Sequence, residues 1–368
     1  MHRIVFALDS FKGSLTSCQA GDACAAAARE LLPGCDVTVV PVADGGEGTV
    51  EALAATRRCT LRVCDTVDPL GRSVRVRYAL AGDTAFMSMA DASGLPLLAE
   101  SERNPLLTSS RGTGIEIADA IAAGARHIVI GAGGSATVDC GTGLLHALGF
   151  RFADRHGADI SPAGGSLTDI ASVIYPRGGV AEGVRFTVLC DVDNPLSGPR
   201  GAAPVFAPQK GADSDAVREL AGGLDSFSRL MPDPRVADMP GAGAAGGATA
   251  GMMAFLGAEA VPGAEAILAA ARFADTLTGA SLVVTGEGRM DATTLGGKTP
   301  YAVLKAAKAA GVPVMALAGS VADRELLLAA GFARVESITP AGMPLHEAMR
   351  RETATANLGA AMLRLLRQ

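Results

Sequence analysis

Residues Val283–Lys298 read VVTGEGRMDATTLGGK, and this stretch decides the fold class of the chain. An apolar run, Leu282–Thr285, enters it, and Pro300 opens an alanine- and lysine-rich run that is typical of a helix. The pattern predicts a strand, a glycine-broken loop and a helix. The loop carries four charged side chains, Glu287, Arg289, Asp291 and Lys298. Because ligands of open α/β sheets bind at the carboxyl ends of strands, we expect a site here.

Three other glycine-containing loops follow short apolar runs in the same way. They are DSFKGS at Asp9–Ser14, ADGGEGT at Ala43–Thr49 and GAGGSAT at Gly131–Thr137. Each apolar run before them is expected to be a buried strand. Our central hypothesis is that these loops converge on one phosphoryl-transfer site.

Composition narrows the class of protein. The chain has 368 residues, which predicts two domains; 49% of the residues are hydrophobic but only 4% are aromatic. Such an aliphatic core is typical of helices packed on parallel strands. The net charge is −6 without a basic stripe, so nucleic acid is not an expected partner. No apolar run approaches the roughly 20 residues of a membrane span and no signal peptide is visible, so we expect a cytoplasmic protein that does not enter a membrane.

The order of patterns along the chain predicts two α/β domains. Alternating polar and apolar residues over Thr60–Met89 indicate antiparallel or mixed sheet, whereas the strand–helix alternation returns from Leu282. We therefore predict one doubly wound parallel domain, Rossmann- or flavodoxin-like, built from residues 1–60 and 275–368. A mixed-sheet α/β domain, residues 61–274, is inserted between its halves. The stretch Gly124–Leu148 suits either sheet.

The first loop is a candidate anion site. Lys12 lies just before an expected helix, whose free N–H groups and dipole favour a negative group. We expect Lys12 to bind phosphate or carboxylate, with Ser10 beside it; the alternative is a surface lysine next to an ordinary helix cap. The loop is not a P-loop, because GxxxxGK[ST] is absent, and the GxGxxG string at Gly241–Gly246 lacks the strand that dinucleotide binding requires.

Two further loops suit substrate hydroxyls and phosphates. Asp44 precedes Gly45 and Gly46, and a carboxylate there can accept hydrogen bonds from a hydroxyl-bearing substrate, although a helix-capping role is the alternative. In the Gly131–Thr137 loop, backbone N–H groups can form an anion-binding concavity. A tight turn that needs positive φ is the alternative for that loop.

Two carboxylates, Asp191 and Asp193, follow an expected strand and precede Asn194-Pro195. Oxygen ligands at this spacing suit Mg²⁺, and one aspartate could instead accept the proton of an attacking hydroxyl. An Asx turn before proline is the alternative. Arg289 could bind a carboxylate or neutralise a transferring phosphoryl group, or simply pair with Asp291.

Taken together, the motifs resemble the bacterial glycerate kinases of glyoxylate and sugar-acid catabolism. The resemblance rests on five segments in order, DSFKGS, ADGGEGT, GAGGSAT, CDVDNPL at Cys190–Leu196 and TGEGR at Thr285–Arg289. It implies an ATP- and Mg²⁺-dependent transfer of the γ-phosphoryl group to D-glycerate, giving 2-phosphoglycerate rather than 3-phosphoglycerate. The chain departs from the family pattern at Ser88, where the family usually has Glu.

The resemblance and the loops together assign the candidate site residues. We expect catalytic roles for Lys12, Asp191 and Arg289; substrate binding by Ser10, Asp44, Gly45, Gly46 and Glu287; binding of nucleotide phosphates by Gly133, Gly134, Ser135, Thr137 and Lys298; and Mg²⁺ binding by Asp191 and Asp193. The expected partners are D-glycerate and ATP, in a monomer or homodimer. The alternatives are a kinase for another small hydroxy acid and a non-catalytic sensor of a sugar acid or nucleotide.

Overall fold

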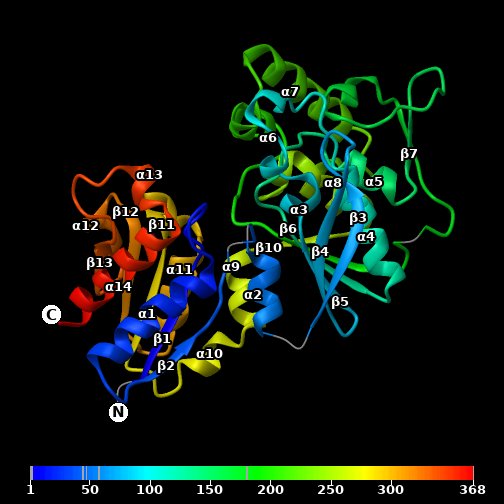
Figure 1. The fold of residues 1–368 in the computed structure, drawn as a ribbon. Coiled ribbons are helices and arrows are strands. Elements are labelled where there is room, and N and C mark those ends of the chain that lie inside the picture. Colours follow the sequence, from blue (N-terminus) through cyan, green and yellow to red (C-terminus); the bar gives the residue numbers. More distant parts are fainter. Residues whose placement is uncertain (1–2, 44, 47, 57–58, 180, 368) are drawn as a thin grey trace. The chain divides into compact units, whose positions relative to one another are not determined.

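The computed structural model describes residues 3–43, 45–46, 48–56, 59–179 and 181–367. It divides into two compact units, the first made of Met1–Arg58 and Pro262–Gln368 and the second of Cys59–Val261 (Figure 1). The predicted division differs from this mainly over residues 262–274, which belong to the first unit. They do so because α9 (Gly263–Ala270) packs against α11 (Thr299–Ala309), a helix of the chain's second half.

The first unit is a doubly wound α/β sandwich. Its strands are β1 (Arg3–Leu8), β2 (Asp36–Val39), β11 (Leu282–Met290), β12 (Val314–Val321) and β13 (Arg334–Ser337). Its helices are α1 (Ser17–Leu31), α2 (Thr49–Thr56), α9 (Gly263–Ala270), α10 (Phe273–Thr276), α11 (Thr299–Ala309), α12 (Arg324–Ala330), α13 (Leu345–Ala348) and α14 (Arg351–Arg367).

The five strands are parallel and lie in the order β13-β12-β11-β1-β2. The chain first moves from β1 to β2 on one side and then returns to β11 on the other side of β1. This is the flavodoxin-like order, and its topological switch point lies between β1 and β11. The predicted doubly wound parallel sheet is therefore confirmed, and the carboxyl ends of β1 and β11 are where a ligand is expected.

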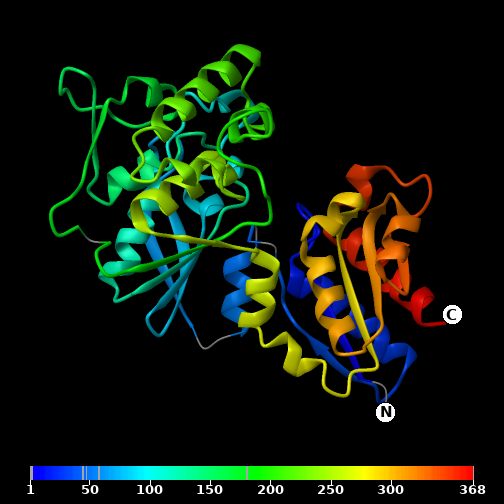
Figure 2. The same ribbon diagram turned by 180° about the vertical axis from the view of Figure 1, so that it is seen from behind.

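Alternating residues of the central strands supply two separate cores. Ile4 and Phe6 of β1 pack with α1 and α14 on one face, which Figure 1 presents to the viewer. Val5 and Ala7 point to the opposite face, which α9 and α11 cover (Figure 2). All four side chains are at least 98% buried. This period of two explains why the strand reads as a continuous apolar run: both of its faces are covered.

The segment Val283–Lys298 folds differently from the prediction in one respect. Glu287 and Arg289 were expected on a loop, but β11 continues to Met290, with Glu287 paired to Ala318 and Arg289 to Ser320 of β12. The glycines of this segment allow the continuation rather than end the strand. A Cβ on Gly286 would lie 1.9 Å from the Leu317 carbonyl oxygen, a clash that only glycine avoids.

The second unit is a mixed α/β structure. Its strands are β3 (Thr60–Val67), β4 (Ser73–Ala81), β5 (Thr84–Ser88), β6 (His127–Gly131), β7 (Arg151–Ala153), β8 (Ser172–Ile174), β9 (Arg185–Leu189) and β10 (Glu259–Val261). Its helices are α3 (Met89–Ser93), α4 (Arg111–Ala122), α5 (Thr142–Ala147), α6 (Ala202–Phe206), α7 (Ser214–Ser228) and α8 (Ala248–Leu256).

The main sheet of the second unit has the order β10-β9-β6-β5-β4-β3. The strands from β10 to β5 run parallel, and β4 and β3 complete an antiparallel meander. The mixed sheet predicted for this part of the chain is confirmed, and the stretch Gly124–Leu148 belongs here, as β6 and α5. Within the described residues, none of the helices combines the length and the apolar character that crossing a membrane requires.

Candidate active site

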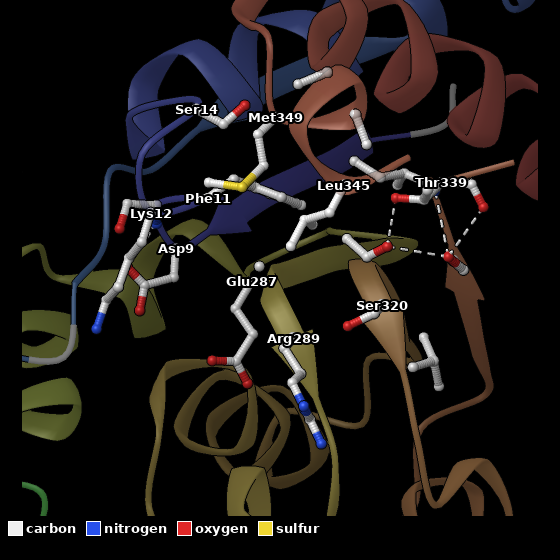
Figure 3. A pocket seen from close by; sticks show the side chains of 18 of the residues that line it. Asp9, Phe11, Lys12, Ser14, Glu287, Arg289, Ser320, Thr339, Leu345 and Met349 are labelled. Carbon is white, nitrogen blue, oxygen red and sulfur yellow. Dashed lines mark hydrogen bonds between the residues drawn. The ribbon is translucent and has the colours of Figure 1, made fainter. Parts of the chain in front are cut away.

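A pocket of about 680 Å³ opens at the carboxyl ends of the first unit's strands. The segment after β1 and the end of β11 meet there, and the Asp9 N–H donates to the Gly286 carbonyl at 2.8 Å. Figure 3 shows Asp9 and Lys12 together with Glu287 and Arg289 among the side chains around it. The pocket thus occupies the switch point of the sheet, where the topology predicts a ligand.

Four basic side chains line this pocket. They are Lys12, Arg289, Lys298 and Arg324. The acidic side chains that line it are Asp9 and Glu287, so basic groups outnumber acidic ones. Such an excess of fixed positive groups favours an anionic ligand. The structure therefore brings together five residues predicted from sequence, Ser10, Lys12, Glu287, Arg289 and Lys298, and adds Arg324 from the start of α12.

Lys12 is held out into solvent by a tight turn. The Phe11 N–H donates to the Leu15 carbonyl at 2.8 Å, the Ser14 N–H donates back to the Phe11 carbonyl at 2.8 Å, and Gly13 adopts a φ of +73° between them. Phe11 and Leu15 are buried and anchor the turn. Lys12 itself is exposed, so its ammonium group lies on a fixed base and can reach an anion at little cost in backbone entropy.

Asp9 fastens this loop to the segment after β11. Its side chain is buried, and Oδ2 accepts from the Thr299 hydroxyl at 2.7 Å at the start of α11. Oδ1 lies 2.6 Å from the Ser10 N–H. A buried carboxylate held from both sides fixes the relative position of β1 and α11. The sequence pattern included Asp9 in its motif but gave no sign of this anchoring role.

Glu287 and Arg289 have partners within their own segment. The Thr294 hydroxyl donates to Glu287 Oε1 at 2.8 Å, and Lys298 Nζ lies 3.9 Å from Oε2. Arg289 Nε lies 3.0 Å from Asp291 Oδ2, so the local ion pair considered from sequence is present. Hydrogen bonds from Thr293, and then the Arg289 guanidinium, lower the pKa of the Asp291 carboxyl. The Arg289 side chain remains 70% exposed, so it can still reach a ligand.

A smaller pocket of about 430 Å³ lies against the same loop on the side of β2. Ser10, Lys12 and Ser14 line both pockets. The hydroxyls of Ser10 and Ser14 are buried and have no hydrogen-bond partner among the residues that the structure describes. Buried hydroxyls without partners are costly, so we expect a polar ligand or a water molecule to complete them.

The structure describes only part of the second predicted loop, Ala43–Thr49. Gly45 and Gly46 are buried, Gly45 with a φ of +87°, and the Gly46 carbonyl accepts from the Thr49 hydroxyl at 2.7 Å. Gly48 lines the smaller pocket. Asp44, the predicted substrate ligand, lies outside the described residues.

In the second unit, a buried lysine supports the Gly131–Thr137 loop. Lys210 Nζ donates to Ser135 Oγ at 2.9 Å and to the Thr137 carbonyl at 2.7 Å, and the side chain is only 3% exposed. Burial lowers the pKa of Lys210 to about 7, although the negative charge of Asp139 acts in the other direction and raises it. Gly134, in the same loop, has a φ of +76°, as the turn alternative required.

Sequence reasoning missed Lys210 because nothing local marks it. It follows Pro208-Gln209 in an otherwise alanine-rich run, and its role depends on burial against a loop more than 70 residues away in the chain. Asp139 is a second missed residue. Its buried carboxylate accepts from the Ser110 N–H and hydroxyl, both at 2.7 Å, and it orders the start of α5 through the Gly141 and Gly143 N–H groups.

The carboxylates after β9 differ from one another. Asp193 is exposed and its Oδ1 lies 2.7 Å from Arg200 Nη2, whereas Asp191 is half-buried with Oδ2 inaccessible to solvent. Across the described ranges, no group of three or more His, Cys, Asp and Glu side chains is arranged to hold a metal ion. Mg²⁺ binding by Asp191 and Asp193 therefore stays a prediction. Ser88, which the resemblance marks as a departure, caps α3 by accepting a hydrogen bond from the Ala90 N–H at 3.2 Å.

Comparison with known proteins gives one consistent family. The model of the glycerate kinase family matches residues 4–368. The chain is 43% identical over 361 residues to a glycerate kinase of Halalkalibacterium halodurans, covering 95% of this chain and 94% of that protein. It is 42% identical over 330 residues to the glycerate 2-kinase of Escherichia coli, covering 87% and 86%.

The fold has a solved counterpart as well. A crystal structure from Salmonella typhimurium LT2, provisionally named glycerate kinase 2, matches with a TM-score of 0.83 at 37% identity. The match covers 99% of this chain and 97% of the other. At this identity and coverage, the likeness extends to both compact units.

Proposed function

Because the chain belongs to the glycerate kinase family and is therefore a phosphotransferase, we propose that it transfers the γ-phosphoryl group of ATP to D-glycerate and forms 2-phosphoglycerate. The position of transfer follows the printed name of the Escherichia coli relative, a glycerate 2-kinase, at 42% identity. The 3-phosphoglycerate product and other small hydroxy acids are the competing outcomes. Membership of a kinase family leaves the non-catalytic sensor without support.

One observation carries the proposal: Lys12, Ser10 and Ser14 line both pockets of the first unit. Phosphoryl transfer to glycerate joins two anions, and a fixed cation that faces two neighbouring cavities can attract both. The larger cavity adds Arg289, Lys298 and Arg324 to this shared lining, whereas Lys12 is the one basic side chain among the described residues that line the smaller cavity. A triphosphate suits the first set and a small hydroxy acid suits the second.

The basic side chains of the larger pocket fit the phosphates of ATP, and Mg²⁺ binding stays a prediction at Asp191 and Asp193. Lys12, Arg289 and Lys298 would hold phosphate oxygens, and Asp191 would hold the metal or the acceptor's proton. When bound, ATP supplies the phosphoryl group, and Mg²⁺ neutralises part of the charge on its phosphates. The protein's own work is then to position the groups and to exclude water, since phosphoryl transfer asks for little covalent help.

On the acceptor side, Ser10 and Ser14 would hydrogen-bond the carboxylate or hydroxyls of glycerate. Asp44, with Gly45 and Gly46, would hold a substrate hydroxyl, as the sequence analysis proposes. We assign proton acceptance to Asp191 in preference to Asp193, because the Asp193 carboxylate is already committed to Arg200 at 2.7 Å. Glu287 would orient Lys298, whose ammonium group lies 3.9 Å from it.

In the second unit, Gly133, Gly134, Ser135 and Thr137 remain candidates for phosphate contact. Lys210 stabilises this loop from the protein interior, because its buried ammonium group donates to Ser135 Oγ and to the Thr137 carbonyl. A loop fixed in this way keeps its backbone N–H groups directed at a ligand, which lowers the entropy cost of binding.

The test is a turnover assay followed by phosphorus NMR of the product. ADP should form only when D-glycerate and Mg²⁺ are both present, and the product should be 2-phosphoglycerate. A panel of L-glycerate, glycolate, lactate and tartronate serves as the comparison. No glycerate-dependent ADP would contradict the function; a 3-phospho product or a better hydroxy acid would contradict only the assigned product or substrate.

A further inference from the structure

We propose that the larger pocket of the first unit is the nucleotide site, and that the adenine base lies against an apolar wall formed by Ile338, Leu345 and Met349. The inference rests on the proposed function for the identity of its ligand. It differs from the sequence expectation, which assigned nucleotide phosphates mainly to the Gly133–Thr137 loop.

The pocket combines basic side chains with an apolar wall. The basic side chains are Lys12, Arg289, Lys298 and Arg324. The apolar wall runs from the end of β13 to α13 and the residue after it, Met349. Figure 3 shows Leu345 and Met349 between Lys12 and Thr339. A purine nucleotide needs both kinds of surface, one for its flat apolar base and one for its polyanionic chain.

The apolar wall exposes large apolar side chains, as a surface that binds a ligand does. Leu345 is 73% exposed and Met349 is 39% exposed, although both side chains are large and apolar. Ile338, which also lines the pocket, is only 4% exposed. Covering exposed apolar surface is favourable, and methionine adapts well to a flat ring.

Met349 also brings the apolar wall close to Lys12. Its Cε atom would lie 3.1 Å from a Cβ placed on Gly13, so this methionine packs against the turn that carries Lys12. A base stacked on Met349 would therefore lie close to the turn that carries Lys12. The volume of about 680 Å³ lies within the roughly 300–1,000 Å³ of typical small-molecule sites.

Two hydroxyl groups of the pocket can accept a hydrogen bond from the amino group of adenine. The Thr339 hydroxyl donates to the Gly319 carbonyl at 2.6 Å, and the Ser337 hydroxyl donates to the same carbonyl at 3.2 Å. Both residues line the pocket. A hydroxyl that has given its proton away can only accept from a ligand. The 6-amino group of adenine can donate to such an acceptor.

The experiment measures binding to the full-length protein by calorimetry, without glycerate. The probes are ATP and inorganic tripolyphosphate, and the variants are Leu345→Ala, Met349→Ala and the double variant. Leu328→Ala is the matched control, an exposed leucine of α12 that does not line the pocket. We expect the double variant to lower the affinity for ATP by about 10- to 50-fold, because two apolar side chains no longer bury surface against the base. Tripolyphosphate should bind the variant as it binds the wild type, and Leu328→Ala should bind both normally.

A second variant tests the contact with the base. Thr339→Val removes the acceptor at constant shape and should weaken the binding of ATP without changing that of tripolyphosphate. Two results would overturn the inference: ATP affinity unchanged in the double variant, or equal loss for ATP and tripolyphosphate. A third would do so in a turnover assay, namely a raised Michaelis constant for D-glycerate with that for ATP unchanged. Because binding is measured without glycerate, the experiment can contradict the proposed nucleotide site even if the protein phosphorylates glycerate. It can equally support the nucleotide site even if glycerate is not the substrate.

Discussion

At the residue scale, the most unusual group is Glu116 in α4. It is fully buried, and neither carboxylate oxygen has a hydrogen-bond partner among the described residues. Burial first, and then the charges of Asp91 and Asp119, raise its pKa well above the usual 4.5. Glu116 is therefore protonated in the folded protein at pH values where it ionises in the unfolded chain. It costs stability in that window, and the cost grows as the pH rises above about 4.5.

Replacing this side chain should stabilise the protein in a pH-dependent way. Glu116→Leu should raise the free energy of unfolding by roughly 1–3 kcal/mol at pH 8, because a buried polar group without a partner is removed. The gain should shrink at pH 5, where the unfolded state also begins to hold the proton. Urea unfolding at both pH values measures it, with exposed Glu219→Leu on α7 as control. A gain that is equal at both pH values would contradict the assignment.

Lys210 acts through the loop that it holds and not by touching a ligand. Lys210→Met keeps an unbranched chain but removes the two hydrogen bonds to Ser135 and Thr137. We expect turnover to fall about ten-fold, the usual effect of losing a group that orients a binding residue. Hydrogen exchange of the Ala132–Thr137 amides should rise in the same variant. Normal turnover with normal exchange would remove Lys210 from this role.

Asp191 is the residue proposed to take the acceptor's proton. Asp191→Asn keeps its shape and should lower turnover by a factor on the order of 10²–10⁴, the range for a general base. Steady-state kinetics at saturating Mg²⁺ measure the turnover of the variant. Asp215→Asn, in an exposed ion pair of α7, provides the control and should behave as the wild type. Near-normal turnover of Asp191→Asn would exclude it as the base.

At the element scale, β11 marks the limit of local sequence reasoning. The apolar run Leu282–Thr285 predicts a strand, but glycines and charges after it predict a loop. The strand continues because β12 supplies partners through Val321. That pairing is long-range and leaves no trace in the local pattern. By contrast, β1 is predicted well, because a strand covered on both faces reads as an unbroken apolar run.

The glycines of β11 lead to a paired prediction. Gly286→Ala would place a Cβ 1.9 Å from the Leu317 carbonyl oxygen, so the β11–β12 pairing must distort. We expect a loss of at least about 2 kcal/mol of unfolding free energy. Gly359→Ala, inside α14 with open space around it, should instead gain about 0.5–1 kcal/mol. Thermal and urea unfolding compare the two; a loss of similar size in both would refute the clash.

At the scale of the whole molecule, the order of strand and helix patterns predicts the two α/β units and the discontinuous first unit. The second boundary falls earlier than predicted, at Pro262, because α9 is assigned by packing against α11 and not by any change in composition. Motif position along the chain locates Lys12, Arg289 and Lys298 in one pocket. It misses Arg324 and Lys210, whose roles depend on what lies next to them in space.

One lysine, Lys12, is proposed to serve both substrates. Steady-state kinetics of Lys12→Ala are the decisive measurement, with Lys308→Ala at the end of α11 as an exposed control. We expect raised Michaelis constants for ATP and for D-glycerate, a fall in turnover of about 10²-fold and unchanged stability. Unchanged Michaelis constants for both substrates, with turnover close to that of the wild type, would contradict this role of Lys12.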